Sequence, residues 1–338
     1  MTAIPVSAQQ TPISEGARPI DLRRDMPQII DLLEVVFNQQ LRNSSQRQIN
    51  PSLGQIPFPF NLFQRDRTIP GFVWERDKRI VGNVSLLTTE TKGRYLIANV
   101  AVYPELRRRG IARRLMQETL QWTADNHGRE VYLQVEANNH GARYLYETLG
   151  FQAIDSATSW SMPFSRLAGL HFPVQSLGPD RFAGFYLRPL RGEDWRVAYQ
   201  LDTLAFHPDL NWPDPLPADI YRNSLRQWWS RLLNSRQQEV WLAIDEATEQ
   251  PLGLGAITTE WGRPHALKVR LLPDWHGRVA RPLFGKLLRR LQYYRRRPIQ
   301  IEQRMDDIVM NELLVEVGFR TRRSLTTMRY ELAGETHP

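Results

Sequence analysis

The sequence of 338 residues contains no cysteine, so it can form no disulfide, no thiolate zinc site and no cysteine nucleophile. No apolar run approaches the roughly 18 residues that a membrane-spanning helix needs. The first residues lack both a basic start and an apolar run, so we expect no signal peptide and a cytoplasmic location. The seven histidines are isolated, and we expect no metal. A Gly-x-Ser-x-Gly elbow and a Walker A loop are also missing.

Lysine is scarce, with only four residues, so arginine carries nearly all of the formal net charge of +8. This charge raises the question of an acidic partner. The arginines lack interleaved aromatic residues, which favours a solvated surface, and we do not expect nucleic acid or a membrane as a partner. One rival nucleic-acid site stays open, formed by Arg289, Arg290, Arg295, Arg296 and Arg297.

The composition, 41% hydrophobic and 24% charged, is that of a folded globular protein. The length suits two domains of about 150 residues each. The stretch from Asn99 to Met116 organises the first of them. It reads as a strand that Pro104 ends, a turn containing Gly110, and an amphipathic helix. Such a helix start carries unpaired N–H groups and a partial positive charge, which predicts an anion site suited to a diphosphate.

The residues of this turn resemble a known family. The pattern Arg107-x-x-Gly110-x-Ala112 is similar to the pyrophosphate loop of the GNAT superfamily of acetyl-CoA-dependent N-acetyltransferases. A strand at 131–135, Asn139, a short helix with Tyr146 and a final Gly150-Phe151 follow at the spacing of that family. The resemblance implies an α/β fold (α+β by some schemes), with a mixed, mostly antiparallel twisted sheet flanked by helices.

The order of expected elements fits a tandem of two GNAT-like domains. We expect a flexible tail at 1–16, a catalytic domain at 17–164, a linker at 165–184 and a degenerate copy at 185–333. In the first domain we expect a strand at 19–22, a helix with Asp25 as its N-cap, and strands at 71–75, 80–89 and 95–102. A final strand pair is expected through Trp160. The stretch 38–68 reads equally as an acceptor-pocket wall or a plain loop, and a further helix is expected at 218–234.

An internal repeat supports the tandem without reference to other proteins. Gly150-Phe151 and Gly318-Phe319 both close a short helix, and the same offset places the strand 131–134 on 299–302. Pro104 and its helix match Pro273 and its helix after a shift of one residue.

The second copy departs from the pattern where chemistry is expected. Its turn at 274–280 lacks the glycine pattern of the helix start, Leu314 stands in place of Tyr146, and Asp307 stands in place of Asn139. An aspartate repels a diphosphate and a leucine cannot donate a proton. We therefore expect no coenzyme site in the second domain.

The resemblance implies acetyl-CoA as a co-substrate. Backbone N–H groups of the loop would hold the diphosphate, the exposed edge of the preceding strand would pair with pantetheine, and the N–H of Val102 would reach the thioester oxygen. Asn139 would bond the pantetheine arm. The implied coenzyme-binding residues are Val100, Ala101, Val102, Arg107, Arg108, Arg109, Gly110, Ile111, Ala112, Arg113 and Asn139.

By the resemblance, Tyr146 falls on the position of the family's general acid. A phenol stays protonated at neutral pH and can donate to a departing thiolate. The alternative is that Tyr146 only packs. The base is less defined: Gln134 stands where ribosomal-protein alanine acetyltransferases have a glutamate, and Glu136 could act through water or be merely solvated. Glu90 and Asn99 are weaker candidates.

The predicted function is acetyl transfer from acetyl-CoA to a primary amine in the N-terminal domain. The amine of a small metabolite, an antibiotic, a protein N-terminus and a lysine all stay open. The alternative is a non-catalytic acyl-CoA-binding regulatory or interaction protein. A homodimer is also left open.

Overall fold

The computed structural model describes residues 15–43, 68–89, 91–170, 172–204, 221 and 237–332. Four predictions therefore fall outside the described residues for most or all of their length. These are the tail at 1–16, the stretch 38–68, Glu90 and the helix at 218–234.

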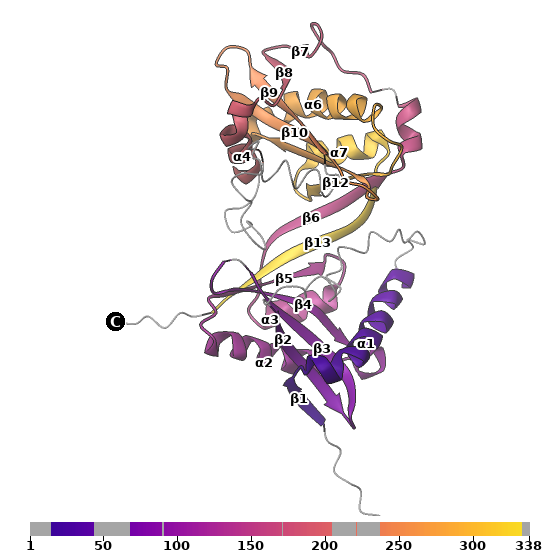
Figure 1. The fold of residues 1–338 in the computed structure, drawn as a ribbon, viewed down its shortest axis with the longest axis vertical. Coiled ribbons are helices and arrows are strands. Elements are labelled where there is room, and N and C mark those ends of the chain that lie inside the picture. The colour runs from indigo at the N-terminus through magenta and orange to yellow at the C-terminus, as the bar shows by residue number, and fades with distance from the viewer. Residues whose placement is uncertain are drawn as a thin grey trace, which may run out of the picture. The chain divides into compact units, whose positions relative to one another are not determined.

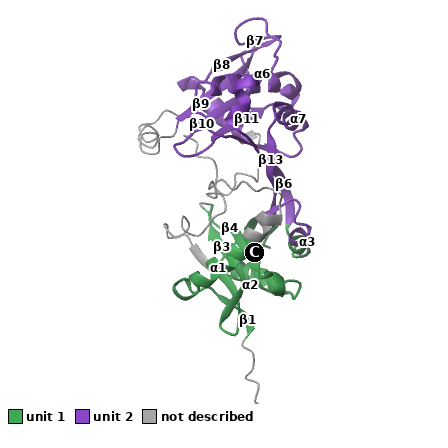
Figure 2. Ribbon diagram, turned by 90° about the vertical axis from the view of Figure 1, so that its right-hand side faces the viewer, with its two compact units in different colours: residues 1–133, 145–151, 329–338 green, residues 134–144, 152–328 purple. Residues whose placement is uncertain are grey.

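The described chain forms two compact units, which Figure 2 shows in separate colours. Unit 1 comprises residues 1–133, 145–151 and 329–338, and unit 2 comprises 134–144 and 152–328. The boundary passes through three elements: β5 (Glu130–Glu136), α3 (His140–Thr148) and β13 (Arg320–Glu331). The predicted domain bounds stay predictions, since the units group residues by contact.

Unit 1 contains a sheet in the order β1-β2-β3-β4-β5 (Figure 1). The β4–β5 pair is parallel and the other three pairs are antiparallel, which is the mixed, mostly antiparallel sheet that we predicted. The strands expected at 71–75, 80–89 and 95–102 are confirmed. The elements are β1 (Glu15–Pro19), α1 (Leu22–Asn43), β2 (Thr68–Arg76), β3 (Arg79–Thr88), β4 (Arg94–Val102) and α2 (Ile111–Asp125).

The first strand and the first helix both begin earlier than predicted. The strand is Glu15–Pro19 and not 19–22, because Leu22 already starts α1. Asp21 takes the capping position, since its Oδ1 accepts from the N–H of Arg23 at 3.0 Å. Asp25, the predicted cap, lies in the first turn, where it binds Arg18.

Helices α1 and α2 pack on the sheet of unit 1. The apolar stripe of α1 buries Ile29, Leu32 and Leu33, and Leu115 and Met116 of α2 are fully buried. Gly82 of β3 permits close approach of α2: a Cβ at that position would lie 3.0 Å from Ile111 and 3.1 Å from Leu115.

Unit 2 holds a sheet in the order β13-β6-β12-β11-β10-β9-β8-β7. Its β11–β12 pair is parallel, as β4–β5 is in unit 1. Two hydrophobic clusters form the core, one containing α6 and the other containing α4. The elements are β6 (Gln152–Met162), β7 (Arg181–Phe182), β8 (Phe185–Pro189), α4 (Trp195–Leu204), β9 (Gln237–Asp245), β10 (Pro251–Thr259), β11 (His265–Leu271), α6 (His276–Leu291), β12 (Ile299–Arg304) and α7 (Ile308–Val317).

The strand pair predicted to end the first copy is one long strand. No turn interrupts β6, which runs unbroken from Gln152 to Met162. It pairs antiparallel with β12 of the second copy, from Ile299 opposite Met162 to Arg304 opposite Ala157. Residues 329–332, at the end of the second copy, belong in turn to unit 1. Each copy therefore contributes its last strand, or part of it, to the unit of the other.

An ion pair confirms the internal repeat at atomic detail. Arg18 at the end of β1 binds both carboxylate oxygens of Asp25, at 2.6 and 2.9 Å. Arg188 at the end of β8 binds Asp194 in the same two-point manner, at 2.6 and 3.0 Å. In each case the next residue is a proline whose carbonyl accepts from the same guanidinium. Burial opposes ionisation of Asp25, yet the hydrogen bond from Arg18 holds the pKa of this carboxyl below its usual value.

Candidate active site

A bulge near the end of β4 is the first feature of the site. Asn83 of β3 pairs with Ala101 and Ser85 pairs with Ala98, so two residues of β4 lie opposite one residue of β3. Asn99 takes a left-handed backbone with φ of 53°. The side-chain amide of Asn83, which is fully buried, donates to the Asn99 carbonyl at 2.9 Å. Asn99 donates from its own amide to the Ser85 hydroxyl at 3.3 Å.

The bulge coincides with the end of the β4–β5 ladder. That ladder runs from Arg94 opposite Glu130 to Ile97 opposite Leu133 and stops there. Among the described strands, the end of β4 from Ala98 to Val102 forms its ladder with β3. The three residues predicted to pair with pantetheine, Val100 to Val102, lie in this end.

The predicted diphosphate loop is an open turn ahead of α2. A 3₁₀ turn at Pro104–Leu106 ends β4, and Arg107 to Gly110 lead into the helix at Ile111. Gly110 has φ of 82°, in the left-handed region that glycine permits, and a Cβ there would meet nothing within 4 Å. Arg107, Arg108 and Arg109 are exposed.

The start of α2 presents free N–H groups. The helix has no side-chain cap, and Arg114 donates to the Gly110 carbonyl at 3.0 Å as the first helical bond. Ile111, Ala112 and Arg113 therefore have no helical carbonyl to which their N–H groups can donate. The helix dipole and the three arginines make this end positive, as an anion site requires.

Tyr146 is buried on α3, with 5% of its surface exposed. Its ring packs against Phe151, with centroids 6.0 Å apart, and Phe151 packs against Tyr330 at 5.3 Å. Its hydroxyl forms no hydrogen bond with another residue of the described chain. Burial raises the pKa of Tyr146, so the phenol stays protonated across the physiological range.

A hydrogen bond connects the start of α2 with the helix that carries Tyr146. Arg113 donates from its guanidinium to the hydroxyl of Thr148 at 2.5 Å. The structure therefore places the predicted loop and the predicted acid on two helices that touch within unit 1.

The remaining predicted site residues belong to unit 2. Asn139 caps α3, because its Oδ1 accepts from the N–H of Ala142 at 3.1 Å. This local role accounts for one end of its amide and leaves the NH₂ group as a donor, so its contact with pantetheine stays a prediction. Glu136 and Gln134 are exposed on β5, and Gln134 bonds the hydroxyl of Thr327 at 3.4 Å.

The second copy repeats the framework of the site. Arg281 and Glu316, each 168 residues after Arg113 and Thr148, form an ion pair between α6 and α7. Asp307 caps α7 by accepting from the N–H of Met310 at 3.1 Å, as Asn139 caps α3.

The second copy lacks both features that open the site in the first. The β10–β11 register is uniform from Gly253 to Thr258, with no bulge. Helix α6 starts at His276, so Arg278, the counterpart of Gly110, already lies in the helix. An additional helical turn thus replaces the open loop. The N–H groups at the start of α6 are therefore arranged differently from those at the start of α2.

His276, the first residue of α6, contacts Asp307 and Leu271 in the second copy. Its Nδ1 lies 3.5 Å from the Asp307 carboxylate, and its Nε2 lies 3.2 Å from the Leu271 carbonyl. The hydrogen bond to Asp307 raises the pKa of His276 above its usual value. Burial opposes the charge of Asp307, but His276 holds the pKa of this carboxyl below its usual value.

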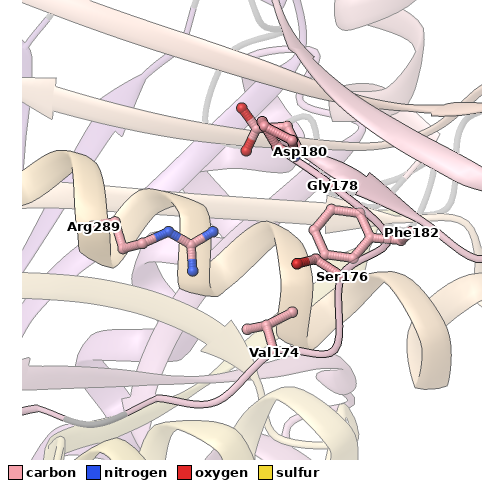
Figure 3. Close-up of a pocket in the computed structure, with 7 residues that line it drawn as sticks. Val174, Ser176, Gly178, Asp180, Phe182 and Arg289 are labelled. Atoms are coloured by element: carbon pink, nitrogen blue, oxygen red, sulfur yellow. The ribbon is translucent and has the colours of Figure 1, made fainter.

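A cavity of about 270 Å³ lies in unit 2 (Figure 3). None of the predicted site residues lines it. Arg289 extends toward it from α6, and Asp180 at its wall pairs with Lys286 at 2.6 Å. Its other lining residues are Val174, Ser176, Gly178, Pro179 and Phe182.

The described residues offer neither a metal cluster nor a membrane-spanning helix. No group of three or more histidines, aspartates or glutamates in these residues could hold a metal ion. None of the helices described is both long and apolar enough to span a bilayer.

Comparison with known proteins gives matches to one family. Residues 37–151 match the acetyltransferase (GNAT) family. The curated relatives include an N-alpha-acetyltransferase of Saccharolobus solfataricus, 29% identical over 90 residues, and N-alpha-acetyltransferase RimI of Mycobacterium tuberculosis, 33% identical over 107 residues. These matches cover 26% and 30% of this chain and only 53% and 66% of the relatives. This segment of the chain is therefore similar to the GNAT acetyltransferase family.

Solved structures extend the fold to nearly the whole chain. A GCN5-related N-acetyltransferase from Sphaerobacter thermophilus superposes with a TM-score of 0.60 at 14% identity, covering 94% of this chain and 95% of that one. A tandem GNAT protein from the clavulanic acid biosynthesis pathway gives 0.51 at 16% identity, covering 94% and 98%. The predicted tandem GNAT fold is therefore confirmed.

Sequence reasoning missed Asn83 as part of the site. Its signal is an amide side chain in the strand at 80–87, which is apolar apart from Asn83 and Ser85. This signal does not reveal a role, because the partner of Asn83 is the carbonyl of Asn99 on the next strand.

Proposed function

We propose that this protein is an N-acetyltransferase that transfers an acetyl group from acetyl-CoA to a primary amine, with the chemistry in the N-terminal copy. The observation that supports this most strongly is the open start of α2 behind Gly110, next to the bulged end of β4. The second copy has neither feature.

In this proposal the coenzyme binds along β4 and the start of α2. The N–H groups from Arg108 to Arg113 hold the diphosphate, and the arginine side chains add a weaker, salt-screened attraction. Val100, Ala101 and Val102 pair with the pantetheine arm, and the N–H of Val102 polarises the thioester carbonyl. Asn139 donates to the pantetheine arm with its NH₂ group.

The chemical step forms a C–N bond and breaks a C–S bond. The amine nitrogen attacks the thioester carbonyl carbon, and the sulfur leaves as a thiolate that takes the proton of the Tyr146 hydroxyl. The amine loses one proton, which passes through water to Glu136. Burial raises the pKa of the Tyr146 phenol, so this group is in its protonated form when the thiolate departs.

We further propose the α-amine of a peptide or protein N-terminus as the acceptor. Both curated relatives are named N-alpha-acetyltransferases, which supports this choice over a small-molecule amine. In ribosomal-protein alanine acetyltransferases a glutamate stands at the position of Gln134. This chain therefore cannot use the base of those enzymes.

The glutamine at position 134, in place of a glutamate, favours a second candidate function: a protein that binds acyl-CoA without turning it over. Incubation with acetyl-CoA and a mixture of peptides with free N-termini separates the two, read by mass spectrometry. Acetylated α-amines support the enzyme. Coenzyme binding without acetylation of any peptide, or of any small amine tested beside them, supports the binding protein.

A further inference from the structure

The end of α6 and the turn between β10 and β11 form a surface in unit 2 that the proposed acetyl transfer does not use. Two aromatic rings stand out on it. Trp261 in the turn is 74% exposed, and Tyr293 after α6 is 81% exposed. Exposed rings of this size bury no core surface and are therefore free to stack on a ligand.

Hydrogen bonds hold the two segments of this surface together. Arg297 donates to the carbonyls of Glu260 and Arg263, at 2.5 and 3.4 Å. The His265 N–H donates to the Pro298 carbonyl at 2.8 Å, and its ring lies 2.7 Å from the Arg295 carbonyl. Trp261 and Tyr293, far apart in the sequence, therefore lie in two segments that these hydrogen bonds join.

The charge of this surface is strongly positive. Arg295 and Arg296 are exposed, and their guanidinium groups form no ion pair with another described residue. Arg289, four residues before Tyr293, is likewise exposed, and it extends toward the cavity of Figure 3. Residues 289–298 include no aspartate or glutamate.

Two glutamates neutralise only part of this charge. Glu239 binds Arg290 at 2.6 Å, and Glu260 lies 3.4 Å from Arg263. The Arg290 guanidinium also lies over the ring of Tyr293, 5.4 Å from its centroid, which holds this ring beside the charges.

We propose that this surface binds single-stranded nucleic acid. Phosphates pair with Arg295 and Arg296, and unpaired bases stack on Trp261 and Tyr293. A duplex hides the faces of its bases and a poly-glutamate peptide has no aromatic groups to stack, so neither ligand uses both the rings and the charges. From the sequence we did not expect this partner, on the ground that the arginines lack interleaved aromatic residues, yet Tyr293 and Tyr294 lie between Arg290 and Arg295.

The test is fluorescence anisotropy of the full-length protein with labelled oligo(dT) and oligo(U), against a duplex of equal length and a poly-glutamate peptide. We expect the single strands to bind most tightly, with affinity that falls as salt rises. Trp261→Ala weakens binding by about tenfold or more because a base no longer stacks there. Arg295→Ala/Arg296→Ala lowers the salt slope by about 1.4, at about 0.7 for each phosphate that the protein no longer neutralises.

Matched controls are Tyr144→Ala, which removes a similarly exposed ring elsewhere in unit 2, and Arg320→Ala, which removes an exposed arginine on β13. Both should leave binding unchanged. Equal affinity for the duplex or the acidic peptide would overturn the proposal, as would no binding or no effect of Trp261→Ala. Acetylation assays of the same variants keep this test separate from the proposed transferase activity.

Discussion

Tyr146 allows the sharpest test at the level of one residue. Its ring packs on Phe151, and its hydroxyl bonds to no other described residue. Tyr146→Phe should therefore leave the melting temperature and the KM for acetyl-CoA close to those of the wild type. Loss of the proton donor should lower kcat by about a hundredfold or more. Tyr144→Phe, on the exposed side of α3, is the control. An unchanged kcat in Tyr146→Phe would show that Tyr146 is not the general acid.

His276 predicts a pH dependence of stability. Its pKa is raised in the folded state, so its bond with Asp307 stabilises the protein fully below the unfolded pKa of about 6.5. This stabilisation is lost as the pH rises through the higher folded pKa. His276→Gln should thus lower the melting temperature at pH 6, by about 2–4 °C for each kcal/mol of stability removed, and much less at pH 9. Melting curves at the two pH values measure this, and an equal difference at both would contradict it.

The bulge in β4 is the element that distinguishes the first copy. A left-handed backbone suits asparagine and glycine but costs a β-branched residue about 1–3 kcal/mol. Asn99→Val should raise the KM for acetyl-CoA and lower stability, because the end of β4 shifts. Asn99→Gly should keep the KM for acetyl-CoA and the stability of the wild type. Because it removes the Asn99 side chain, this variant also tests whether that side chain is the base. Equal KM values in the two variants would show that the bulge does not position the coenzyme.

The sequence could predict these elements but not how they are arranged at the site. The strand from 94 to 102, the turn with Gly110 and the helix after it follow local patterns, and all three were predicted. The bulge depends on the register between β3 and β4, which no local pattern specifies. The start of α1 differs from the prediction because both Asp21 and Asp25 suit a cap, and only the bond between Arg18 and Asp25 distinguishes them.

At the scale of the whole molecule, β6 of the first copy belongs to unit 2, and the end of β13 of the second copy, from Arg329, belongs to unit 1. The sequence could not show this, because the side chains of β6 alternate between the two faces of the sheet in the same way whichever strand β6 pairs with. Separate fragments 1–170 and 171–338 should therefore not fold independently. The first lacks β12, which pairs with β6, and Tyr330, which packs on Phe151 under Tyr146. Mixed or co-expressed fragments should associate and regain acetyl-CoA binding, as size-exclusion chromatography and calorimetry would show. A fragment 1–170 that folds and binds alone would contradict this.

Calorimetric titration with acetyl-CoA measures whether each chain has one working coenzyme site, as we propose. We compare the wild type with Gly110→Glu and with Arg278→Glu, the same change at the matching position of the second copy. Glutamate at 110 places a negative charge and strain where the diphosphate is expected, whereas Arg278 lies in a closed helical turn. We expect one site in the wild type and in Arg278→Glu, and none in Gly110→Glu. Two sites, or binding that survives Gly110→Glu, would contradict it.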